Sequence, residues 1–173
     1  MLGHNGSPHP LRDTAISLDL AARSCAERGL RFTPLRQYVL EALLVAGRPL
    51  GAYDLLRLLG ERLGRDVSPP TAYRALAFLQ HHGFVKRLES CRSFVPTIRQ
   101  TAPETVDETV DETAGESGVF LICNSCGTTV EIDAEGLGPM LLSHARAYGF
   151  RVNHSSHELQ GTCETCQSKG AKP

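Results

Sequence analysis

The chain has 173 residues, of which 41% are hydrophobic and 6% aromatic, and its formal net charge is -1. This length is enough for one large domain or for two small domains with separate cores. No segment approaches the ~20 consecutive apolar residues of a membrane-spanning helix, so we expect no membrane partner. Residues 1–10 lack the basic-then-apolar order of a secretory signal, which predicts a cytoplasmic protein.

The two halves of the chain carry opposite charge. Residues 1–99 contain 14 Lys and Arg against 8 Asp and Glu, whereas residues 100–173 contain 4 against 11, giving net charges of +6 and -7. A basic domain is attracted to the phosphates of nucleic acid, and an acidic domain is repelled by them. If nucleic acid is the partner, the first half contacts it, although many domains carry a modest imbalance without such a partner.

Helical periodicity in the first half predicts four helices, over residues 14–28, 34–46, 50–63 and 69–82. Thr33 and Ser68 precede the second and fourth helices, and we expect their hydroxyls to cap the backbone there. Pro34, Pro69 and Pro70 fall in first turns, where a missing N–H group costs little.

Two short β-prone runs, 84–88 and 93–96, follow these helices and flank a turn. Packed helices followed by a hairpin give the order of a winged helix, which presents its last helix to the major groove of DNA. The order alone leaves other partners open, because many small helical domains end in a hairpin.

Residues 100–118 contain almost no large apolar side chain, and the run Thr-Val-Asp-Glu at 105–108 is repeated at 109–112. Such a segment cannot bury a core, so it is predicted to be a mobile linker. Beyond it, the pattern predicts strands over 119–122, 128–132 and 150–159 and a helix over 137–147. The second domain is therefore expected to be α+β.

Four of the six cysteines form two C-x-x-C pairs separated by 36 residues: Cys123, Cys126, Cys163 and Cys166. Each pair lets one tight turn aim two sulfurs at a single point, and two pairs complete the four-coordinate shell that Zn²⁺ prefers. We predict a structural zinc ion that joins the start of the second domain to its end. Two disulfides and a redox-active dithiol are the competing interpretations; the lack of a secretory signal and the matched second pair disfavour them.

The same four cysteines bear on catalysis. A zinc enzyme needs an open ligand position, which four thiolates do not leave, so we expect no enzymatic activity and no small-molecule substrate. Cys25 lies on the apolar face of the first predicted helix, and we expect it to be a buried thiol without a function.

Several stretches, in their order and spacing, resemble the Fur family of bacterial metalloregulators, and most closely its zinc-uptake regulators. These stretches are residues 29–36 (GLRFTPLR), 52–56 (AYDLL), 69–76 (PPTAYRAL), 83–85 (GFV) and the two cysteine pairs. The resemblance implies an α+β chain with an N-terminal winged-helix DNA-binding domain and a C-terminal zinc-stapled α/β dimerisation domain. The expected division is a flexible tail over 1–13, the winged helix over 14–98, an acidic linker or hinge over 99–117, the zinc-binding dimerisation domain over 118–167 and a flexible tail over 168–173.

The resemblance also implies which side chains contact DNA. Tyr73 and Arg74 lie one turn into the expected recognition helix, where an arginine can bond a guanine edge with two hydrogen bonds. Arg31 and Arg36 would bond phosphates, which positions a protein without reading the sequence. The full set is Tyr73, Arg74, Tyr53, Arg31, Arg36 and Thr71. Judged from the residues alone, solvated arginines and a core position for Tyr73 remain open.

The expected sensing site departs from the family pattern. Zinc-uptake regulators of this kind use His and Cys near the two ends of the wing hairpin and at the hinge, with a Glu shortly after the first cysteine pair. Lys86, Thr97 and Glu116 occupy the first three of these positions here, and only Glu131 matches. We expect a second, regulatory zinc ion to use Glu131 and Glu116 with either Cys91 or His82, since Zn²⁺ accepts S, N and O donors.

These expectations combine into a zinc-responsive repressor of zinc-uptake genes. A homodimer would place two recognition helices in successive major grooves of a double-stranded operator. One alternative is a Fur-family sensor of iron, manganese or peroxide, because the sensing ligands are altered. An alternative of another class is a zinc-ribbon protein-interaction module that does not bind DNA.

Overall fold

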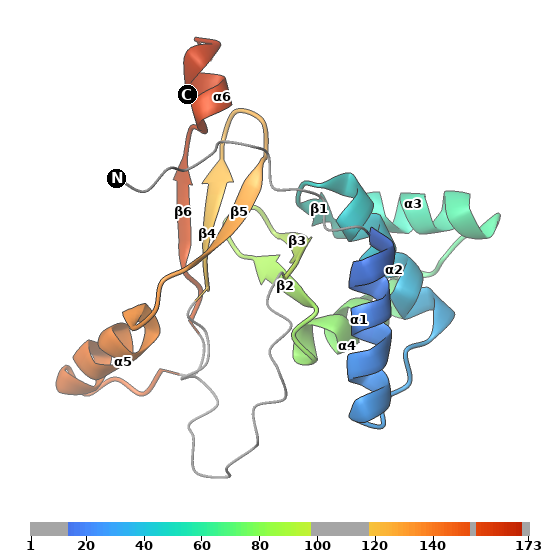
Figure 1. Cartoon of the computed structure of the whole chain (residues 1–173), viewed down its shortest axis with the longest axis horizontal. Coiled ribbons are helices and arrows are strands. Elements are labelled where there is room, and N and C mark those ends of the chain that lie inside the picture. Colours follow the sequence, from blue (N-terminus) through green and yellow to red (C-terminus); the bar gives the residue numbers. More distant parts are fainter. Residues whose placement is uncertain (1–13, 98–117, 153–154, 171–173) are drawn as a thin grey trace. The chain divides into compact units, whose positions relative to one another are not determined.

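The computed structural model describes residues 14–97, 118–152 and 155–170 (Figure 1). The chain divides into two compact units between residues 100 and 101. The acidic repeat of the predicted linker and Glu116 lie outside the described ranges. No helix within those ranges has the length and apolarity needed to cross a membrane.

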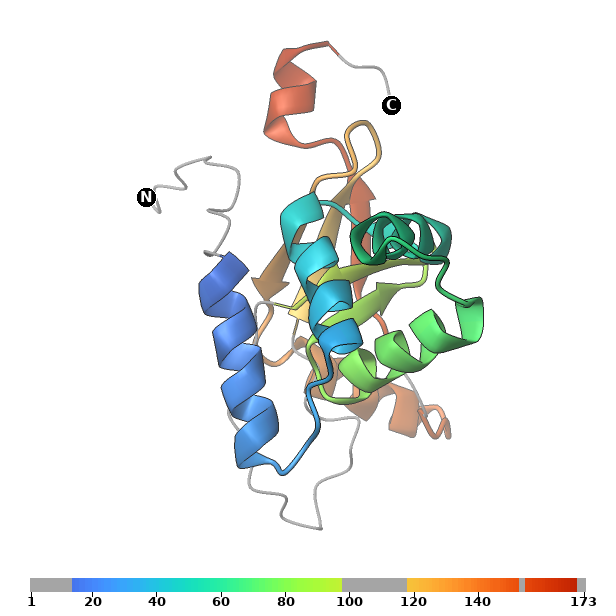
Figure 2. The same cartoon turned by 90° about the vertical axis from the view of Figure 1, so that its right-hand side faces the viewer.

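The first unit is built around four helices: α1 (Thr14–Glu27), α2 (Pro34–Ala46), α3 (Ala52–Leu63) and α4 (Pro69–His81). Helix α2 contacts each of the other three helices and lies beside α1 in Figure 2. Val39 and Leu43 of α2 are completely buried, and they join Leu55 of α3 and Leu76 of α4 in one hydrophobic core. Cys25 is part of this core, and burial raises the pKa of its thiol. The expectation that Cys25 is a buried thiol is confirmed.

Three short strands complete the first unit: β1 (Leu50–Gly51), β2 (Val85–Leu88) and β3 (Ser93–Pro96). They pair antiparallel in the order β1-β3-β2. The hairpin of β2 and β3 confirms the predicted wing, and Cys91 lies in its turn beside Arg92, whose φ of 51° is in the left-handed region. Two-residue β1 is too short to produce a periodic pattern, and the predicted third helix, over 50–63, wrongly included it.

The second unit contains a three-stranded sheet of β4 (Gly118–Cys123), β5 (Thr129–Asp133) and β6 (Glu158–Gly161), with the helices α5 (Leu137–Ala147) and α6 (Glu164–Ser168). Central β4 pairs antiparallel with β5 and parallel with β6. Within this unit, Figure 1 shows the β4–β5 turn and α6 at one end of the sheet and α5 at the other. The predicted α+β class is confirmed.

The predicted strand over 150–159 is wrong for most of its length. Only Glu158 and Leu159 of that range belong to β6, and residues 151–152 and 155–157 have no regular structure. Phe150 instead completes the C-terminal turn of α5, because its N–H donates to the carbonyl of Ala145 after Gly149 adopts a φ of +77°. This is the bonding pattern that commonly closes helices. The apolar side chain that suggested a strand therefore belongs to a helix end.

The predicted hydroxyl caps are also wrong. Thr33 and Ser68 stand at the N-cap positions of α2 and α4, but neither side chain bonds the helix backbone. The Ser68 hydroxyl lies 2.8 Å from the hydroxyl of Thr71 instead. In α4 one possible backbone donor is missing because Pro70 has no N–H, and the N–H of Thr71 bonds the carbonyl of Ser68.

Candidate metal centre and nucleic-acid interface

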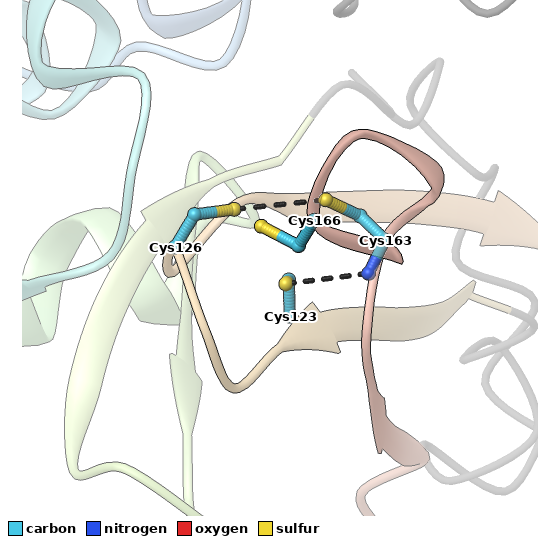
Figure 3. Close-up of side chains that lie close together, drawn as sticks. All are labelled: Cys123, Cys126, Cys163 and Cys166. Carbon is cyan, nitrogen blue, oxygen red and sulfur yellow. Dashed lines mark hydrogen bonds between the residues drawn. The ribbon is translucent and has the colours of Figure 1, made fainter. Parts of the chain in front are cut away.

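The four cysteines of the second unit converge on one point (Figure 3). Cys123 is the last residue of β4, and Cys126 lies in the turn that follows. Cys163 and Cys166 lie at the start of α6, just beyond β6. Because β4 and β6 are parallel, with Cys123 opposite Gly161, both strands deliver their cysteines to the same end of the sheet.

The spacing of the four sulfurs suits one tetrahedral ion. All four ligand atoms lie within 4.8 Å of one another, and the sulfurs of Cys126 and Cys163 are 3.7 Å apart. Zn–S bonds of about 2.3 Å in a tetrahedron place neighbouring sulfurs about 3.8 Å apart. All six cysteines are free thiols, so the geometry favours a metal centre over the two disulfides.

Hydrogen bonds prepare these thiols unequally for deprotonation. The backbone N–H of Cys163 donates to the sulfur of Cys123 at 3.3 Å, and this bond, with a second from Cys126, lowers the pKa of Cys123 to about 6. The Thr128 hydroxyl, 3.1 Å from the Cys126 sulfur, lowers the pKa of that thiol. The pKa of Cys166 is raised to about 12 by its contacts with Cys163 and Cys126 and by burial.

Thr128 is a supporting residue that the sequence analysis missed. Its hydroxyl follows the first cysteine pair by two residues, and that spacing was the only signal available. A hydrogen bond to a metal-bound sulfur orients the ligand and tunes its basicity, so Thr128 would support a metal held by Cys126 without contacting the ion itself.

Glu131 lies on β5 of the same unit, paired with Phe120 of β4. A Cβ added at Gly118 would come within 2.7 Å of the Glu131 carboxylate oxygen Oε1. The absent side chain of Gly118 therefore leaves room for this carboxylate. Nothing in the sequence pattern marked Gly118 as relevant to the site.

The N-terminal half of α4 and the start of α3 present polar and aromatic side chains to solvent. Tyr73 is 50% exposed and Tyr53 is 85% exposed. The core position considered for Tyr73 is therefore wrong. Arg74 is exposed next to it, and its guanidinium donates to the hydroxyl of Thr71 at 3.5 Å. Thr71 thus connects the helix start at Ser68 to Arg74.

Arg31 and Arg36 differ in their surroundings. Arg31 is exposed, whereas Arg36 is half-buried with its guanidinium carbon 3.4 Å from the centre of the Phe78 ring. Arg36 also donates a hydrogen bond to the backbone carbonyl of Arg31. These contacts hold Arg36 against α4, so it has a structural role that the sequence analysis did not foresee.

The structure does not bring His82 and Cys91 together. His82 follows the last turn of α4, next to the base of the hairpin, where the N–H of Thr97 bonds the carbonyl of Phe84. Cys91 lies at the opposite end, beyond four-residue strands that each span about 13 Å. In the parts of the chain that the structure describes, the only group of three or more His, Cys, Asp or Glu donors is the four-cysteine cluster.

A winged-helix unit followed by a sheet that carries a four-thiol centre defines a metal-binding winged-helix protein. The model of the ferric uptake regulator family matches residues 27–160, and this chain belongs to that family. The family expected from the sequence is thereby confirmed.

Zinc uptake regulators are similar to this chain over most of its length, both in sequence and in structure. The zinc uptake regulation protein of Escherichia coli (strain K12) is 36% identical over 146 residues, which cover 84% of this chain and 78% of that protein. A zinc uptake regulator solved in complex with zinc and DNA has a TM-score of 0.80 at 34% identity, covering 92% of this chain and 99% of the other. The crystal structure of holo XcZur has a TM-score of 0.74 at 35% identity, covering 90% and 99%.

Proposed function

We propose that this chain is a zinc-responsive transcriptional regulator that binds operator DNA as a dimer and represses zinc-uptake genes when zinc is bound. The observation that carries the proposal is the likeness, along almost the whole chain, to a zinc uptake regulator solved with zinc and DNA. Exposed Tyr73 and Arg74 on α4 and the converging cysteines supply the chemistry that this function needs. A regulator of this kind acts in the cytoplasm, where thiols stay reduced.

The DNA-binding face is assigned to α4 and its surroundings. Arg74 is placed to bond a guanine edge from the major groove, and Tyr73 and Thr71 contact a base or phosphate beside it. Tyr53 and Arg31, both exposed, bond phosphates of the DNA backbone and fix the position of the protein along the duplex. Arg36 can reach a phosphate only with the part of its guanidinium that Phe78 does not cover.

The four cysteines hold one structural zinc ion. Bound zinc fastens the β4–β5 turn to α6 and stabilises the folded second unit, because the unfolded chain offers no preformed site. Four thiolates close the coordination shell, which leaves no position for a substrate or an activated water. This centre is therefore structural and not catalytic.

The second unit provides the dimer contact. Seven of the eleven exposed large hydrophobic side chains among the described residues lie in this unit. Leu121, Ile132 and Leu159 are 37%, 37% and 60% exposed, and the strand register places all three on one face of the sheet. An apolar face of this kind is covered when two copies associate. The dimer then presents two α4 helices to successive major grooves.

A second zinc ion provides the response to zinc concentration. Its ligands are Glu131 and Glu116, with either Cys91 or His82 as the third donor. This part of the proposal rests on donor chemistry and on the family pattern. Because His82 and Cys91 lie at opposite ends of the hairpin, one ion takes one of them and not both.

Gel-shift titration of promoter DNA with and without a zinc chelator tests the function. We expect a shifted complex with zinc that is lost when the chelator is added. Equal affinity in both conditions would remove the sensing role, and no affinity for any duplex would favour a protein-interaction module. Metal analysis of the purified protein distinguishes zinc from iron or manganese.

The zinc content of Cys91→Ser tests the second site. A wild-type value of two ions per chain and a variant value of one would place this thiol in the sensor. An unchanged content would remove Cys91 from the site.

A further inference from the structure

The C-terminal end of α4 is held by a residue from a distant part of the chain. Arg28 follows α1, yet its Nη1 donates to the backbone carbonyl of His82 at 3.3 Å. Its Nη2 lies 3.1 Å from Nδ1 of the same histidine. The two ends of one guanidinium therefore contact both the backbone and the ring of the residue that closes the helix.

Ring stacking extends this contact to α2. The His82 ring packs edge-on against Phe78 with 4.4 Å between ring centres, and Phe78 also contacts the guanidinium of Arg36. The series of contacts from Arg28 to His82, Phe78 and Arg36 thus joins the end of α1, the start of α2 and the end of α4. We call these four residues the α4 clamp.

The chemistry of a helix end explains why an arginine suits this position. The last carbonyls of a helix have no intrahelical donor, and the C-terminal end of the helix carries partial negative charge. Arg28 satisfies one of these carbonyls with a cation. Its fork geometry also lets the second nitrogen reach the ring, which a lysine could not do at the same time.

The state of the His82 ring fits an acceptor. Burial, followed by the neighbouring Arg28, His81 and Arg36, lowers the pKa of His82, which favours the neutral form of the ring. A neutral imidazole with its proton on Nε2 can accept from Arg28 at Nδ1. The positive charges of Arg28 and Arg36 make this an unfavourable place for Zn²⁺.

We infer that Arg28 is a positioning residue for DNA reading, which fixes the direction of α4 through His82, and that His82 serves this clamp and not the zinc sensor. Helix α4 has 13 residues and is therefore about 20 Å long. Arg74 lies eight residues, or about 12 Å, before His82, so a tilt of about 5° at the clamped end would move it by about 1 Å, which lengthens a hydrogen bond to a base beyond its normal range.

The test rests on the proposed function and uses the full-length, zinc-loaded protein. The probes are a duplex that the wild type selects from a random pool and a scrambled duplex of equal length. Arg28→Lys keeps the charge but loses the fork, so we expect affinity for the selected duplex to fall about tenfold and affinity for the scrambled duplex to change less than about twofold. The control is Arg23→Lys, because Arg23 pairs with Asp19 on the exposed face of α1.

His82→Phe provides a second variant that keeps the ring contact with Phe78 and removes Nδ1. We expect the same selective loss, and the double variant should be no worse than the more affected single variant, because both remove one interaction. An unchanged zinc content in His82→Phe is also expected.

Three outcomes would overturn the inference. Arg28→Lys with wild-type affinity for both duplexes would make Arg28 a phosphate contact or a bystander. Equal losses on both duplexes would show a general loss of DNA affinity without a positioning role. Loss of a zinc ion in His82→Phe would return His82 to the sensor. If the wild type selects no sequence, the proposed function fails as well, whereas a selective wild type with an indifferent Arg28→Lys defeats only the positioning role.

Discussion

At the scale of single residues, the four thiols are not equivalent before the metal binds. Backbone hydrogen bonds to its sulfur lower the pKa of Cys123 to about 6, whereas the pKa of Cys166 is raised to about 12. At pH 7 Cys123 has therefore lost its proton and Cys166 has kept it. Zinc binding must therefore displace the proton of Cys166, whereas the sulfur of Cys123 is already deprotonated.

The number of protons released on zinc binding follows from this difference. We expect fewer than four protons per structural zinc at pH 7, with the number rising and the zinc affinity falling as pH drops below about 6, because protons then compete for Cys123. Calorimetry of the metal-free, reduced protein in buffers of different ionisation enthalpy measures the number. Release of all four protons at pH 7 would contradict the account.

Gly118→Ala tests the place of Glu131 in the sensor. The new Cβ would lie 2.7 Å from the Glu131 carboxylate, and this flexible side chain would move away while the strand stays in place. We expect weaker binding of the second zinc ion and an unchanged structural ion. Gly161→Ala is the matched control, since a Cβ there meets nothing within 4 Å. If both variants bind two ions as the wild type does, Glu131 is not a regulatory ligand.

At the scale of elements, the sequence predicted what depends on local periodicity. The four helices and the hairpin of the first unit have regular apolar faces, and the structure confirms them. Phe150 was misassigned because an apolar residue that closes a helix looks the same as one that begins a strand. The contact of Arg28 with His82 joins residues 54 apart, and no local pattern encodes such a pair.

The candidate site was likewise predictable only where a local sequence pattern marks it. The spacing of the cysteine pairs was enough to predict a metal site. The roles of Thr128 and Gly118 depend on their contacts with Cys126 and Glu131, which only the folded structure shows. The departures at Lys86 and Thr97 are visible only against the family pattern. Thr97 uses its hydroxyl to bond the carbonyl of Gly83 at 2.5 Å, and so joins the end of the hairpin to the end of α4.

Removing the exposed arginine of α4 should lower the sequence specificity of DNA binding. Arg74→Ala removes the side chain assigned to a guanine edge, so we expect affinity for operator DNA to fall about 10- to 100-fold and one operator position to lose its preference. Binding-site selection with the variant measures both effects. A uniform loss across all sequences would instead make Arg74 a phosphate contact.

At the scale of the whole molecule, the second unit, which carries the four cysteines, and the first unit should respond differently to metal removal. Hydrogen exchange should show loss of protection in β6 and α6 on chelation, because the cysteines join both to β4. The hydrophobic core of the first unit, to which α2 belongs, should keep its protection. Unchanged protection in β6 after complete metal removal would show that zinc does not hold this unit together.

The separate charges of the two halves fit a division of labour. The basic half is attracted to the phosphates of DNA, whereas the acidic half, to which we assign the dimer contact, is repelled by them. Zinc can favour DNA binding only to the extent that it binds the DNA-competent form more tightly than the other form. The central claim is therefore a dependence of DNA affinity on free zinc.

Fluorescence anisotropy of a labelled operator, titrated with the dimer at several buffered concentrations of free zinc, measures that dependence directly. The account predicts that affinity rises with free zinc until the second ion is bound, while the structural ion stays in place throughout. The same affinity at every zinc concentration that leaves the structural ion bound would contradict it.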